Sequence, residues 1–109
     1  MSISMFFVSP QTPEEKIFNL PVCTEEAFRQ AVLPAAERAG AQYVRLFETG
    51  YELSGADALA ISEELRSVAN QLEMDSSEMA MLMLSRIEKL QMEIERIFKT
   101  RPSSILYIG

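Results

Sequence analysis

Apolar residues recur every three or four positions through residues 54–99. That spacing places side chains along one face of an α-helix, so the segment is predicted to form two amphipathic helices. Only Met74 and Asp75 separate them, and so short a turn predicts an antiparallel helical hairpin. The inner face of the first helix is expected to hold Ala58, Ile61, Leu65, Val68 and Leu72, and that of the second Ala80, Met83, Ile87, Leu90, Ile94 and Ile97.

Polar residues mark the expected ends of these helices. Ser54 with Asp57, and Asp75 with Glu78, have the spacing of a capping box, in which side chains satisfy the free amides of the first turn. Pro102 lacks an amide hydrogen and is expected to stop the second helix.

Three short segments rich in aromatic and branched side chains predict strands, at residues 3–8, 41–48 and 105–108. With the helices, they predict a single α+β domain over residues 1–109. In this domain a small three-stranded sheet packs against the long antiparallel helical hairpin.

The segment between the first two predicted strands carries helix signals. Thr12 followed by Pro13 predicts one short helix, and Thr24 predicts the start of another. Pro34 interrupts the second, so we expect a kink or two short helices that meet there, ending at Gly40.

Composition limits the class of protein. The chain has 109 residues, 48% of them hydrophobic, and one cysteine, Cys23, so a core without an intramolecular disulfide is expected. No apolar run has the roughly 18 residues of a membrane helix, and the first ten residues lack the features of a secretory signal. A cytoplasmic location is therefore predicted.

Acidic residues are concentrated in one part of the chain. Residues 1–80 hold 13 acids against 5 bases, whereas residues 81–109 hold 3 acids against 5 bases. The excess of acids gives residues 1–80 a negative electrostatic field, which repels nucleic acid and anionic lipid and attracts basic proteins. We therefore expect neither nucleic acid nor membrane as a partner. A solvated helix face that keeps the protein soluble is the alternative.

The sequence offers little for catalysis. It has no histidine, and its four glycines form no phosphate-binding cluster. Adjacent glutamates such as Glu63 and Glu64 diverge by about 100° on a helix, which suits solvated charges better than an acid–base pair. We therefore expect no enzyme, no cofactor and no metal site, and a buried or inert thiol at Cys23.

Candidate binding residues surround Tyr51. An aromatic ring among carboxylates on a loop is a plausible anchor for a basic partner, although Tyr51 could instead pack under the hairpin. Met81 and Met92 lie off the apolar stripe, so they contact either a second layer of the chain or a partner. The partner-binding set is predicted to be Glu48, Tyr51, Glu52, Asp57, Glu63 and Glu64.

Residues 53–72, LSGADALAISEELRSVANQL, resemble a helix opening of small bacterial toxin-immunity proteins, in which a Ser-capped start precedes alanine- and leucine-rich turns. The resemblance implies a compact cytosolic binder without catalytic activity. It carries no set of binding residues over to this chain.

These observations lead to two main hypotheses. The first is an immunity protein that neutralises a cognate toxin by occluding a basic site with an acidic surface. The second is a secretion chaperone or adaptor for an effector protein, which would use a homodimer and an exposed apolar groove. A small-molecule-binding or enzymatic domain is a third. The oligomeric state stays open.

Overall fold

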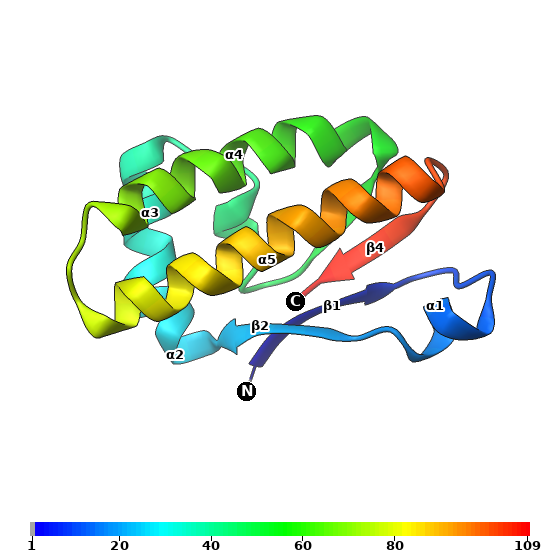
Figure 1. The fold of residues 1–109 in the computed structure, drawn as a ribbon, viewed down its shortest axis with the longest axis horizontal. Coiled ribbons are helices and arrows are strands. Elements are labelled where there is room, and N and C mark those ends of the chain that lie inside the picture. The colour runs from blue at the N-terminus through cyan, green and yellow to red at the C-terminus, as the bar shows by residue number, and fades with distance from the viewer. Residues whose placement is uncertain (1) are drawn as a thin grey trace.

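A computed structural model of the chain describes residues 2–109. Helices α4 and α5 run side by side, and the strands follow α5 along its length (Figure 1). The elements are β1 (Ser2–Phe7), α1 (Pro13–Ile17), β2 (Leu20–Thr24), α2 (Glu25–Ala27), the π-helical turn η1 (Phe28–Val32), α3 (Leu33–Ala39), the 3₁₀ turn η2 (Val44–Leu46), β3 (Tyr51–Ser54), α4 (Gly55–Glu73), α5 (Glu78–Thr100) and β4 (Ile105–Ile108).

The sheet has four antiparallel strands in the order β2-β1-β4-β3. The predicted α+β class is therefore confirmed, whereas the predicted three-stranded sheet is wrong. Strands β1 and β4 lie where the sequence predicts them and pair at the centre of the sheet. The edge strands β2 and β3 were not predicted.

The predicted hairpin forms the main part of the core. Every residue predicted for the inner faces of α4 and α5 is buried, except Ala58, which is half-buried against the core. On β1 the buried residues Ile3 and Met5 alternate with Ser4 and the partly exposed Phe6. One face of the sheet therefore joins the helices in a single core.

Residues 41–48, predicted as a strand, instead contain the turn η2. Their buried residues are Ala41, Val44 and Phe47, which repeat every three positions as in a 3₁₀ turn. The carboxylate of Glu64 accepts hydrogen bonds from three backbone amides at the start of this turn. A tertiary partner therefore overrides the strand propensity of the segment.

Strand β2 has features that conceal it in the sequence. Pro21 lies on this edge strand, where a missing amide hydrogen costs no ladder hydrogen bond. The register shifts between Ile3 and Ser4, which pair with Cys23 and Pro21, so Val22 is the extra residue of a bulge.

Helix starts differ in detail from the predicted capping boxes. Ser54 is the N-cap of α4, but its side chain makes no capping hydrogen bond. Helix α5 begins later than expected, because Ser77 is its N-cap and accepts from the amide of Ala80 at 3.1 Å. Asp75 accepts from the amide of Ser77 at 2.9 Å and shapes the turn instead.

Pro34 changes the helical hydrogen bonding in the turn that precedes it. It cannot donate to the carbonyl of Gln30, and the amide of Leu33 bonds to the carbonyl of Phe28, five residues back. The helix widens into η1 and continues as α3 to Gly40, whose φ of 70° ends it.

Candidate functional site

Two of the predicted binding carboxylates have intramolecular partners. Glu48 forms an ion pair with Arg29 and is half-buried. Glu64 bonds the amides of Gln42, Tyr43 and Val44 at 3.0, 2.9 and 3.1 Å. Both side chains therefore hold the segment between α3 and β3 in place.

Tyr51 and Asp57 form a small cluster at the junction of β3 and α4. The Tyr51 hydroxyl donates to the Asp57 carboxylate at 3.2 Å, and its ring meets Tyr43 edge-on at 5.6 Å. The pKa of Tyr51 is raised, first by burial and then by the Asp57 carboxylate, with smaller contributions from Tyr43 and Glu64. The phenol therefore stays neutral at physiological pH.

Glu52 and Glu63 are the exposed members of the predicted set. Glu52 projects from the opposite face of β3 to Tyr51, across from Tyr107 on β4. Glu63 lies beside Glu64 on α4, at a shallow hollow of about 280 Å³ that Gly40 also lines. Within residues 2–109, none of the ion pairs includes Glu52, Asp57, Glu63 or Glu64. We call these four residues, together with Tyr51, the acidic edge.

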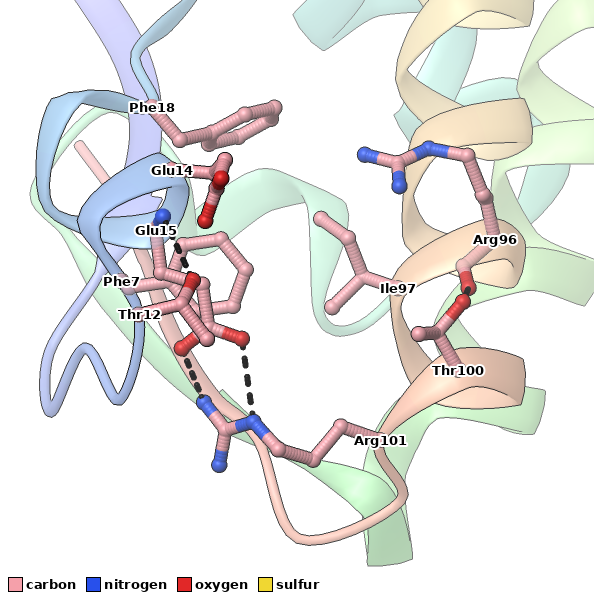
Figure 2. A pocket seen from close by; sticks show the side chains of 9 residues that line it. All are labelled: Phe7, Thr12, Glu14, Glu15, Phe18, Arg96, Ile97, Thr100 and Arg101. Carbon is pink, nitrogen blue, oxygen red and sulfur yellow. Dashed lines mark hydrogen bonds and ion pairs between the residues drawn. The ribbon is translucent and has the colours of Figure 1, made fainter.

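A pocket of about 240 Å³ lies between α1 and the end of α5, at the corner that Figure 2 shows. Arg101 reaches across it and bonds both carboxylate oxygens of Glu15, at 2.5 and 3.0 Å. Its guanidinium also lies 5.9 Å from the centre of the Phe7 ring. Arg101 lowers the pKa of Glu15 by this hydrogen bonding, and the Gln11 amide adds to the effect. Glu15 and Arg101 therefore satisfy one another at this corner.

A second hollow, of about 330 Å³, lies between the edge strand β2 and the first half of α5. We call it the β2–α5 groove. Its walls are mostly apolar, and Arg86 is its one charged residue. It is lined by Ser2, Pro21, Cys23, Thr24, Ala27, Met79, Leu82, Met83 and Arg86.

Cys23 lies at this groove as a buried free thiol, as the sequence predicts. Burial raises its pKa to about 11, although the nearby Arg86 guanidinium acts in the opposite direction. The thiol is therefore protonated at neutral pH and contributes an unreactive apolar surface.

Sequence reasoning did not identify Arg86 or the groove. A signal was present, because the residues three and four positions from Arg86 on α5 are Leu82, Met83, Lys89 and Leu90, none of them acidic. Arg96, in contrast, has Glu93 three positions before it and pairs with that carboxylate at 2.7 Å.

Met81 and Met92 have exposed fractions of 63% and 66%, so neither contacts a second layer of this chain.

The outer side of the hairpin also carries a polar cluster. There Glu95 accepts from Ser62 and from Gln91, and these hydrogen bonds lower its pKa.

No known protein family matches the chain, and neither a curated protein nor a solved structure shows a significant similarity to it. Across residues 2–109, no helix combines the length and the apolar character needed to cross a membrane.

Proposed function

We propose that the chain is a cytosolic binding protein of the toxin-immunity type, which occludes a basic site on a cognate protein with the acidic edge. One observation carries this proposal: Glu52, Asp57 and Glu63 come from neighbouring elements and have no arginine or lysine partner within the described chain. Carboxylates in this state keep their full attraction for a basic surface.

Within this proposal, the members of the predicted set have different roles. Glu48 and Glu64 serve the fold, so the exposed residues Glu52 and Glu63 are the main candidates for contact. Tyr51 is half-buried and bonds Asp57, on the opposite face of β3 to Glu52. The acidic edge is divided between β3, an edge strand of the sheet that carries Tyr51 and Glu52, and α4, which carries Asp57, Glu63 and Glu64.

The test is the double variant Glu52→Lys/Glu63→Lys, measured against the protein encoded by the adjacent gene. We expect at least a tenfold weaker Kd, mainly through slower association, because charge reversal turns attraction into repulsion. Glu73→Lys/Glu88→Lys, which likewise reverses two exposed charges but outside the acidic edge, is the matched control and should bind normally. Equal affinities for the two variants would contradict the proposal.

A secretion chaperone or adaptor is the second candidate function. The exposed Met81 and Met92, together with the β2–α5 groove, favour it, because flexible thioethers suit an adaptable binding surface. Sedimentation at micromolar concentration separates the two functions: a stable homodimer supports the chaperone, and a monomer supports the inhibitor.

A further inference from the structure

The β2–α5 groove combines an apolar floor with one available positive charge. Leu82, half exposed, and the methionines Met79 and Met83 supply the α5 side, while Pro21, Cys23 and Ala27 supply the other. Its volume of about 330 Å³ is in the range of small-molecule sites. Because the Cys23 thiol is neutral, the only ionised side chain of the lining is Arg86.

Arg86 is only partly used by the fold. One guanidinium nitrogen donates to the carbonyl of Val22 at 3.3 Å, which satisfies the extra residue of the β2 bulge. A guanidinium has five N–H donors, and no carboxylate pairs with this one in the part of the chain that the structure describes. The groove therefore presents unused donors suited to an anionic oxygen.

We propose that the β2–α5 groove binds an aliphatic carboxylate of medium length, with the chain against Leu82, Met83 and Pro21 and the carboxylate on Arg86. The apolar walls exclude a polar ligand, and the positive charge selects a carboxylate over an alcohol or an amine of the same length. The groove lies at β2, whereas the acidic edge is carried by α4 and by β3, the strand at the opposite edge of the sheet. The two sites share no residue, so this proposal does not rest on the proposed inhibitor function.

The methionine methyl groups allow a test on the unmodified protein. Octanoate, decanoate, decan-1-ol and decylammonium are titrated below their micelle concentrations while the spectrum of ¹³C-labelled methionine methyls is recorded. Met79 and Met83 line the groove, whereas Met92 is exposed outside it and reports non-specific association. We expect saturable shifts at Met79 and Met83 alone, with decanoate binding most tightly.

Chain length sets a quantitative expectation. Each fully buried methylene strengthens binding by at most about fourfold, so decanoate should bind up to about fifteenfold more tightly than octanoate. An equal midpoint for decanoate and decan-1-ol, or a Met92 shift that follows the Met79 shift, would overturn the proposal. No saturable shift with any of these ligands would overturn it as well.

Variants of two arginines on the same helix complete the test. Arg86→Gln removes the charge and shortens the side chain by two bonds, so decanoate should bind about tenfold more weakly and decan-1-ol unchanged. Arg86→Lys should retain most of the affinity. Arg96→Gln, whose arginine already pairs with Glu93, is the control and should bind decanoate normally. If Arg86→Gln binds decanoate like the unmodified protein, the assignment of Arg86 is wrong.

Discussion

Helix α5 runs along the side of the molecule that carries α1 and β2 (Figure 1). Arg101, just after the C-terminal end of α5 (the far end), lies at α1, and Arg86, in the N-terminal half of α5 (the near end), lies at β2. At the far end, Arg101 bonds both oxygens of Glu15 and lies against the Phe7 ring. At the near end, Arg86 makes one hydrogen bond to a backbone carbonyl and lines an apolar groove. The same kind of side chain is a structural clasp in one place and, in our proposal, a binding group in the other.

The contrast depends on what faces each arginine. The capping residues of α1 fix Glu15, since Thr12 accepts from its amide and its carboxylate accepts from the Gln11 amide. A carboxylate held in this way pairs with Arg101 at little further entropic cost. The residues opposite Arg86 are Pro21, Val22 and Cys23, which offer no carboxylate. Local sequence on β2 therefore leaves its charge available.

The largest expected effect is loss of the whole fold, and with it the contacts of both Arg86 and Arg101. Ile87 is 1% exposed and lies between them on the buried face of α5. Ile87→Asp buries an unpaired carboxylate, which should cost several kcal/mol against a total stability of about 5–15 kcal/mol. We expect loss of the cooperative thermal transition by circular dichroism. Met81→Asp, at an exposed position on the same helix, should stay folded. A cooperative transition for Ile87→Asp would refute the core assignment.

Glu63 and Glu64 in the acidic edge differ in the same way as the two arginines: one carboxylate is bonded within the fold and the other is not. Glu64 bonds three backbone amides, whereas its neighbour Glu63 has no ion-pair partner among the described residues. Glu64→Ala should lower the free energy of unfolding in urea by about 1.5–3 kcal/mol, because the amides lose a charged acceptor. Glu63→Ala should change it by less than about 0.5 kcal/mol. Similar losses for both would show that Glu64 does not hold η2.

Long periodic patterns were sufficient to predict the hairpin. Over about 45 residues the apolar spacing repeats many times, and the inner faces of α4 and α5 follow from it without knowledge of any partner. Short elements lack that redundancy. The prediction for residues 41–48 failed because a carboxylate from α4, Glu64, binds its amides, and β2 was missed because a bulge and Pro21 break its pattern.

The site shows the same limit. The acidic residues could be found by counting them in the sequence. The different roles of Glu63 and Glu64 could not be predicted, because they depend on where the amides at η2 lie. The β2–α5 groove is formed by residues about 60 positions apart, Cys23 and Met83 among them, so no local pattern reveals it. Only the absence of an acid three or four positions from Arg86 pointed to its available charge.

The clasp at the far end of α5 should depend on pH. The pKa of Glu15 is lowered in the folded protein, so its contribution is present above the ordinary value of 4.5 and is lost as the pH falls through the lowered value. Glu15→Gln removes that titration. The melting temperature of the variant should be lower at pH 7, and the difference from the unmodified protein should shrink below about pH 4.5. Glu14→Gln is the matched control. A difference that stays constant down to pH 2.5 would exclude the ionic clasp.

The smaller of the two arginine effects on stability is expected at the near end. Arg86→Gln removes a charge that no carboxylate of the described chain balances, together with one hydrogen bond of 3.3 Å to the Val22 carbonyl. The free energy of unfolding should therefore fall by no more than about 1 kcal/mol. Arg101→Gln breaks the two bonds to Glu15 and should destabilise the protein more, in parallel urea titrations. Decanoate should then separate the two variants again: at one concentration it should raise the melting temperature of Arg101→Gln more than that of Arg86→Gln, which binds it about tenfold more weakly. If Arg86→Gln proved the more destabilising of the two, Arg86 would be part of the fold, and the groove would have no charge to offer a ligand.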